Sequence, residues 1–379
     1  QTQKKDELTA IFRTPLTVKF AYEGGEEVRE MQIDKPAHRY TIKLPKRPLW
    51  ISFDPGNSIP KTLKLDFSED MLIAGLENDD CVMGRIHACR ALAGKPTPKS
   101  TRALKKALYD DKFWGVQAEA AKALGKVHTD EALDALLAKT VKHAKARRAV
   151  ATALGEWRNY RAAKKLNEML KKDESYFVEA SAALSLGRTR DKSAFVALKR
   201  ALSKDSHTDV IRNHIFSGFV ALRDMRALEI MRNWTTYGKS QQARYAAIAA
   251  LGRLAGQSTE DSDKEMARET IEPLLEGDFR QVLSAVSGLA SLKDPKAMGA
   301  LRKLARTTHD SRIKKSAADA ASEIGASQGS AKQVTELKDE HEKLKTDYEK
   351  LIQRLDKLEN KDDSKPAKKS PKKRTRKKK

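Results

Sequence analysis

A short, alanine-rich apolar phrase returns along most of this chain and predicts its architecture. The phrase closes on glycine or alanine and is clearest at 116–125, 146–155, 178–187 and 243–252. Its successive copies end at Ala93, Gly125, Gly155, Gly187, Ala221, Gly252, Ala290 and Gly325, which lie 30 to 38 residues apart. A nearly constant period of this length indicates a solenoid of stacked helical repeats.

Each repeat contains two helical patterns with recognisable ends. The second helix follows an aspartate whose carboxylate can accept backbone N–H bonds as an N-cap, namely Asp80, Asp111, Asp173, Asp209, Asp278 or Asp310. Its apolar stripe is narrow, as Ala120, Ala121 and Leu124 show, and favours close stacking on neighbouring repeats. The pattern resembles the HEAT repeat family in its short, alanine-rich form, and we expect an α-solenoid of about eight repeats over 68–325.

Residues 1–67 have a different pattern, with β-branched and aromatic residues alternating at period two. Strands are predicted over 11–22, 26–33, 38–44, 49–53 and 61–65, with tight turns at Gly24-Gly25 and Pro55-Gly56-Asn57. Several short strands with alternating faces predict a small antiparallel β-sandwich. The expected fold class is therefore mainly α, with this β-sandwich module in front of the solenoid.

After the repeats, a hinge of small residues at 326–330 leads into a heptad pattern. The apolar seam is Val334, Leu337, His341, Leu344, Tyr348, Leu351, Leu355 and Leu358, spaced alternately by three and four residues. This spacing predicts a coiled-coil helix within 326–360 and a homodimer through 331–360. In a parallel pair Glu340 would face Lys345, and Arg354 would face Glu359. The alternative is a helix that packs back on the last repeat as a cap.

The chain is strongly basic, with 75 Lys and Arg against 52 Asp and Glu and a net charge of +23. The last segment, 361–379, holds eleven Lys or Arg and two Asp, and so carries 11 − 2 = +9 of that charge. We expect it to be a disordered tail that contacts polyanions without sequence specificity, or one that only aids solubility. No apolar run reaches the ~18 residues of a membrane span.

Seven basic residues recur near one level of the second helices. They are Arg85, Arg147, Arg148, Arg212, Arg244, Arg280 and Lys315. Second helices line the concave face of such solenoids, so these residues could form a cationic ladder that contacts an acidic partner or the carboxyl end of a peptide. The alternative is structural, because each could bond to the aspartate of the adjacent repeat.

Four segments near the start carry a second resemblance. Residues 1–3, 12–16 and 48–57 resemble the β module that follows the catalytic domain in the aminopeptidase N family of gluzincin zinc metallopeptidases. Residues 79–88 resemble the first helical repeat of that family's C-terminal domain. The resemblance implies that this chain is part of a longer zinc exopeptidase, packs against that protein's own N-terminal catalytic domain, and limits the access of peptide substrates to its cleft.

The chemistry that the resemblance implies requires residues that this sequence lacks. The family's His-Glu-x-x-His zinc motif and its Gly-x-Met-Glu-Asn strand are absent, and 341–345 places Lys345 where the second histidine belongs. We therefore expect no catalytic residue, no metal and no cofactor in this chain, with zinc in the parent's catalytic domain. The two cysteines, Cys81 and Cys89, are expected to be packing residues. The rival interpretation is a catalytically dead scaffold or protein-interaction module with a polyanion-binding tail.

Overall fold

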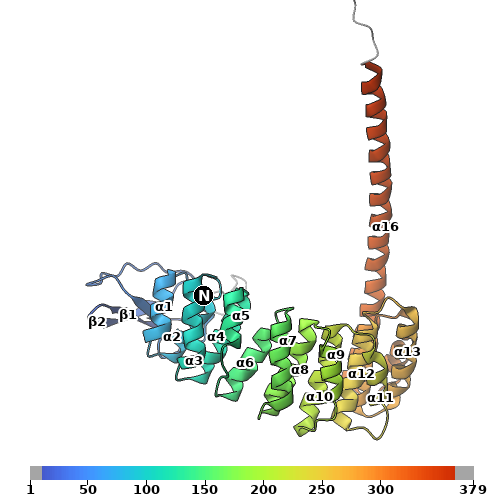
Figure 1. Cartoon of the computed structure of the whole chain (residues 1–379), viewed down its shortest axis with the longest axis horizontal. Helices are drawn as coiled ribbons and strands as arrows, with labels where there is room; N and C mark the ends of the chain where they lie inside the picture. Colours follow the sequence, from blue (N-terminus) through green and yellow to red (C-terminus); the bar gives the residue numbers. More distant parts are fainter. Residues whose placement is uncertain (1–10, 363–379) are drawn as a thin grey trace, which may run out of the picture. The chain divides into compact units, whose positions relative to one another are not determined.

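The structure is a computed structural model that describes residues 11–362, except for the side chains of 328–336, 338, 339 and 354–362. The chain divides into two compact units, 1–292 and 293–379. The first unit joins a small sheet to a series of helix pairs, and the second contains a short helix and a very long one (Figure 1).

The sheet has three antiparallel strands, β1 (Thr14–Tyr22), β2 (Gly25–Ile33) and β3 (Trp50–Phe53), with β1 in the centre. Gly24 turns the β1–β2 hairpin at a φ of 90°, a conformation that glycine adopts without a steric penalty. Alternate residues of β1 form the buried core of this sheet, namely Leu16, Val18 and Phe20.

The expected β-sandwich is wrong, because segments 38–44 and 61–65 form no strands. Ile42 and Leu44 still pack against the core of the sheet, together with Ile59. Prolines that flank these segments remove backbone donors that a strand ladder needs. Irregular chain therefore covers the apolar face of the sheet, where a second sheet was expected.

The helices of the first unit come in consecutive pairs, as the repeat pattern predicted. The pairs are α1 (Glu69–Asn78) and α2 (Val82–Leu92), α3 (Pro98–Asp110) and α4 (Trp114–Val127), α5 (Asp130–Leu137) and α6 (Ala144–Leu154), α7 (Tyr160–Lys172) and α8 (Tyr176–Thr189), α9 (Ala194–Ala201) and α10 (Val210–Leu222), α11 (Ala227–Trp234) and α12 (Gln241–Ala255), and α13 (Asp261–Ile271) and α14 (Phe279–Leu292). Short 3₁₀ turns, His207–Asp209 and Glu272–Glu276, precede α10 and α14. The mainly α, HEAT-like architecture is confirmed.

The small residues that close each repeat phrase let second helices touch backbone to backbone. A Cβ on Gly187 of α8 would lie 2.0 Å from the carbonyl oxygen of Gly218 in α10. A Cβ on Gly252 of α12 would lie 2.1 Å from the carbonyl oxygen of Gly288 in α14. Real side chains do not approach this closely, so the spacing between these helices requires glycine.

Four of the six aspartates expected as N-caps accept bonds from backbone N–H groups, whereas Asp209 accepts from the side chains of Arg212 and Ser240. Asp278 accepts from Arg280 and Gln281, and Asp310 accepts from Arg312. Asp111 and Asp173 likewise accept from the residue two positions on, in the turn before the helix begins. At the first repeat, Asp79 rather than the expected Asp80 has this role, because its Oδ1 accepts from the N–H of Cys81 at 2.9 Å.

The second unit contains a 3₁₀ turn, Pro295–Ala297, the helix α15 (Met298–Thr307) and the 52-residue helix α16 (Ser311–Asp362). The first turns of α16 pack against α15 and bury Ile313, Ala317 and Ile324. The helix then continues through 326–330, where the sequence suggested a hinge. Alanine and serine are compatible with a helix, and a single glycine costs only about 1 kcal/mol.

We predict that Gly252→Ala destabilises the repeat array by roughly 1–3 kcal/mol, because the new methyl group overpacks a backbone contact. Gly299→Ala is the matched control, since nothing lies within 4 Å of its ideal Cβ and the residue is exposed in α15. Denaturant titration should show a lower midpoint for the first variant and an equal or higher one for the second. Equal midpoints would contradict the close backbone packing.

Candidate functional site

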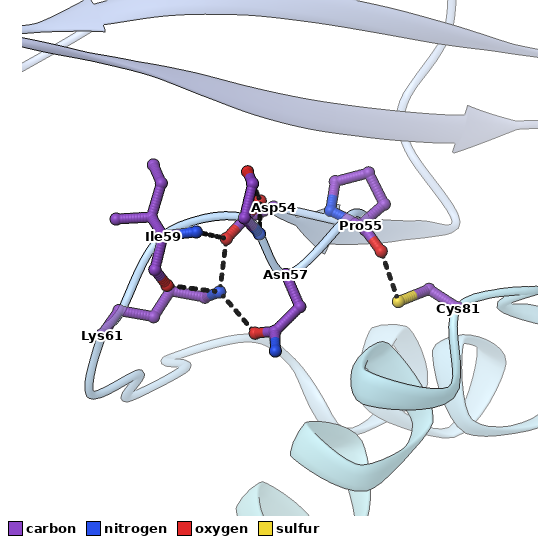
Figure 2. Close-up of polar contacts among 7 residues, drawn as sticks. Asp54, Pro55, Asn57, Ile59, Lys61 and Cys81 are labelled. Carbon is purple, nitrogen blue, oxygen red and sulfur yellow. Dashed lines mark hydrogen bonds and ion pairs between the residues drawn. The ribbon is translucent and has the colours of Figure 1, made fainter.

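The loop after β3 is organised around one buried carboxylate. Asp54 is 1% exposed, and its Oδ1 accepts from the backbone N–H of Ser58 at 3.0 Å and from the Ser58 hydroxyl at 2.8 Å. Its Oδ2 accepts from the N–H of Ile59 at 3.1 Å and from Lys61 Nζ at 2.5 Å (Figure 2). Burial alone would raise the pKa of Asp54, but these bonds outweigh it and hold the pKa well below its usual range.

The same loop attaches the sheet to the first helix pair. The Cys81 thiol donates to the carbonyl oxygen of Pro55, with Sγ 2.9 Å from that oxygen (Figure 2). The side chain of Trp50 packs on the backbone of Gly75 in α1, and Lys19 Nζ lies 3.5 Å from the Asp80 carboxylate. Two of the four segments that carry the aminopeptidase N resemblance, 48–57 and 79–88, therefore meet at one junction, and residues 1–3 lie outside the described part of the chain.

The groove over α2, α4 and α6 consists of two neighbouring hollows, the first of which lies beside this loop. Its first part, of about 410 Å³, is lined by Lys61, Met83, His87 and Arg90 among others. Its second part, of about 670 Å³, is also lined by Arg90, and further by Glu119, Lys122, Lys126, Thr152 and Glu156. Arg90 lines both hollows.

The walls of this groove carry mixed charge. Arg90 Nε donates to Glu119 at 3.1 Å, and Lys122 Nζ donates to the other oxygen of that carboxylate at 2.7 Å. Burial would raise the pKa of Glu119, but the two bonds lower it overall, so the carboxylate stays ionised. The pKa of His87 is lowered by burial and by the nearby cations Arg90 and Lys61, which keeps its imidazole neutral near pH 7. The groove wall therefore combines cationic, anionic and neutral polar side chains.

Two of the expected basic residues bond to aspartates of the next repeat with the same geometry. Arg85 Nε donates to Asp111 Oδ2 at 2.8 Å and its Nη2 donates to Oδ1 at 3.2 Å. Arg147 binds Asp173 through the same atoms at 2.8 and 2.9 Å. Each arginine also donates to carbonyl oxygens in the turn before its own helix. These bidentate pairs join successive repeats, and they use the planar fork of the guanidinium group.

Further along the array, the expected basic residues make other contacts. Arg212 donates to Asp209 and Asp205, both at 2.5 Å, within its own repeat. Arg244 has no ion pair with any residue that the structure describes, and it lies over the rings of Tyr237 and Tyr245, 5.8 and 5.9 Å from their centroids. The Tyr245 hydroxyl donates instead to Asp278 at 2.7 Å and thereby lowers the pKa of that carboxyl group. Sequence reasoning missed Tyr245, although it stands next to the expected arginine position.

The remaining basic residues are exposed. Arg148 lies over the ring of Phe177 at 5.3 Å from the centroid, and Arg280 is exposed at the start of α14. Lys315 is exposed on α16, in the second unit. Some of the seven basic residues are therefore paired with aspartates and others are exposed. Their contact with a ligand stays a prediction.

The heptad residues of α16 that the structure describes are exposed. These are Leu337, His341, Leu344, Tyr348 and Leu351, while the side chains of Val334, Leu355 and Leu358 lie outside the described set. The expected basic tail also lies outside it, from residue 363 onward. Between residues 11 and 362, no helix is both long and apolar enough to cross a membrane.

No group of three or more described His, Cys, Asp or Glu side chains could hold a metal ion. The two cysteines take part in packing and in the junction. Cys89 is fully buried, and its burial raises the pKa of its thiol well above the usual range. Cys81 is partly buried and donates to Pro55, as described above.

We predict that Arg147→Ala destabilises the chain by roughly 3 kcal/mol, because it leaves Asp173 partly buried without its partner. The Arg147 side chain is 12% exposed and that of Asp173 is 8% exposed. Arg148→Ala is the adjacent control and should change stability little, because Arg148 is exposed. Comparable losses in a denaturant titration would contradict a structural role for the Arg147 pair.

We also predict that Asp54→Asn lowers stability at neutral pH by about 2–4 kcal/mol, since Lys61 loses its partner. A carboxyl group with a depressed folded pKa stabilises above its unfolded pKa of about 3.9, and this contribution disappears as the pH falls through the folded value. The deficit of the variant should therefore shrink in acid. Urea midpoints at pH 7 and pH 3 would test this, with Asp66→Asn, at an exposed position, as the control. A deficit that stays constant would contradict it.

Comparison with known proteins agrees with the repeat pattern. The chain matches the HEAT repeat family over residues 69–142 and 137–218. A search of curated proteins finds no match. Human deoxyhypusine hydroxylase is a similar solved structure, with 16% identity over 68% of this chain and 96% of that chain, at a TM-score of 0.31. The YibA protein of Escherichia coli has 16% identity over 70% of this chain and 99% of its own, at a TM-score of 0.41.

A third similar structure is aminopeptidase A of Legionella pneumophila. It has 13% identity and a TM-score of 0.47, and the match covers 81% of this chain but only 45% of the aminopeptidase. At these scores the three structures carry no argument about function. Residues 69–218 thus match HEAT repeats, and the chain as a whole is a mainly helical, HEAT-like array with a small antiparallel sheet at its N-terminal side.

Proposed function

We propose that this chain is the non-catalytic region of an aminopeptidase N-like zinc peptidase. The catalytic domain of the parent protein would precede it and would remove N-terminal residues from peptides. The repeat array would cover the catalytic cleft and restrict which peptides can enter. Zinc would belong to that catalytic domain, because no described residues of this chain form a metal site and the His341 segment has Lys345 where a ligand is needed.

The observation that supports this proposal is the junction between sheet and array. Residues 48–57 and 79–88, which resemble the aminopeptidase N family, fold against each other through the Cys81–Pro55 bond. The Asp54 network fixes the loop that makes this contact. A β module fixed on the first repeat is the arrangement that the resemblance implies, whereas the repeats alone would fit any HEAT-type protein.

The groove over α2, α4 and α6 is the surface that we assign to the substrate path. Arg90, Lys122 and Lys126 line it together with the ionised Glu119. Such a wall can bond to the backbone of an extended peptide and to its charged side chains without strict sequence preference. It would therefore affect long substrates more than a single aminoacyl group.

A scaffold is the second candidate, and the charge of the chain favours it. A net charge of +23 with a basic tail suits contact with polyanions. One subunit of the general transcription machinery resembles the same peptidase family without zinc chemistry and contacts proteins and DNA. In that case the sequence before Gln1 would lack the zinc motif.

The test compares the isolated chain with the same chain joined to the region encoded before it. The chain alone should bind no stoichiometric zinc and hydrolyse no aminoacyl amide, whereas the joined protein should do both. In the joined protein, a double substitution Lys122→Glu and Lys126→Glu should change kcat/KM for long peptides and leave aminoacyl-amide hydrolysis unchanged. Lys105→Glu is the control, at an exposed position of α3 outside the groove.

Two results would overturn the proposal. One is an upstream region without His-Glu-x-x-His and without zinc-dependent turnover, which would favour the scaffold. The other is turnover by the isolated chain together with one tightly held zinc ion. If turnover is present but the groove substitutions act equally on short and long substrates, the role of the groove is wrong while the family assignment stands.

A further inference from the structure

The second half of α16 carries a continuous apolar stripe that the second unit leaves open to solvent. Leu337 is 69% exposed, Leu344 73%, Tyr348 65% and Leu351 56%. Large aliphatic and aromatic side chains are rarely this exposed in a row, and a contiguous row of them marks an interaction surface. His341 stands within the stripe and is also exposed.

This stripe is not the continuation of the face with which α16 packs on α15. The buried residues of the first turns are Ile313, Ala317, Ala320, Ala321 and Ile324. At 100° per residue, the stripe from Leu337 to Leu351 is turned by roughly 140° from that face. A straight helix cannot therefore present both sets to one neighbour, and the stripe needs a partner other than α15.

We propose that the partner is a second copy of this chain, aligned in parallel through a two-stranded coiled coil. The stripe alternates by three and four residues, which is the spacing that brings a and d positions of two helices together. Leucine occupies the d positions at 337, 344 and 351, where leucine favours two strands. This inference is independent of the proposed peptidase role.

The flanking charges favour a parallel copy. Glu340 and Lys345 are both exposed and stand at g and e positions, so each would face its opposite on the partner helix. In the sequence Arg354 and Glu359 repeat this relation with the signs reversed. Asp347, the g residue between them, would face the uncharged Ile352 and pairs with Lys350 of its own helix at 3.3 Å. No like-charged pair is thus brought together along the seam.

His341 at an a position gives the pair its register. A polar side chain at one a position lowers the stability of a coiled coil, but it disfavours staggered pairings that would place it against leucine. The remaining heptads supply the apolar area, and ~30 residues of regular pattern are enough for a dimer of modest affinity. We therefore expect association at micromolar concentration.

The first test measures the mass of the full chain by light scattering across a range of micromolar concentrations. The chain should reach the mass of a dimer, and Leu344→Asp should raise the dissociation constant on the order of a hundredfold, because it places two buried carboxylates face to face. Thr346→Asp is the matched control, on the same helical turn but away from the seam, and should leave association unchanged. A monomer at every concentration would overturn the proposal and favour a helix that docks on its own chain.

A charge exchange tests the partner and its direction. Glu340→Lys and Lys345→Glu should each weaken dimerisation several-fold, because each creates like-charged pairs across the parallel seam. The double variant should restore the dissociation constant of the unmodified chain. Dimerisation without this rescue would overturn the parallel alignment. Loss of dimerisation on Thr346→Asp as strong as on Leu344→Asp would overturn the seam itself.

Discussion

Close approach of neighbouring second helices is the constraint on which the repeat array depends. Gly187 against Gly218 and Gly252 against Gly288 leave no room for even a methyl group between the helices. Alanine takes the same role elsewhere, as where Gly125 lies against Ala153. Because the backbones touch, few atoms separate one repeat from the next, and the inter-repeat contacts of a solenoid then supply most of its stability.

Polar bonds join the neighbouring repeats that this packing brings together. Arg85 and Arg147 each tie the turn before their own helix to the aspartate of the following repeat. The two N–H groups of the guanidinium fork donate to both carboxylate oxygens in only one relative orientation. Each bidentate pair therefore specifies the angle between two neighbouring repeats as well as their distance. At the later repeat, Tyr245, the neighbour of Arg244, makes a single bond to Asp278. Later repeats therefore differ in how they are joined.

The sheet belongs to the same body because its loop is fixed from both sides. Asp54 organises the loop from within, and Cys81 holds it from the first helix pair. Beside this junction, the groove that Arg90 lines forms the surface over α2, α4 and α6. The proposed peptidase role uses this surface, whereas the proposed dimer uses α16. The two functions would thus occupy separate units of the chain.

The sequence alone determined the helical repeats, their paired helices and the heptad spacing, because each is a periodic pattern that local geometry converts directly into structure. It also placed Arg147 one repeat before Asp173. Only the tertiary structure decided that 38–44 covers a sheet without joining it, that α16 runs through 326–330, and that Arg147 is paired while Arg148 is exposed. These outcomes depend on which residues compete for each backbone hydrogen bond and for each packing face of a helix or sheet. Such competition is set by contacts between distant residues, which a local pattern does not encode.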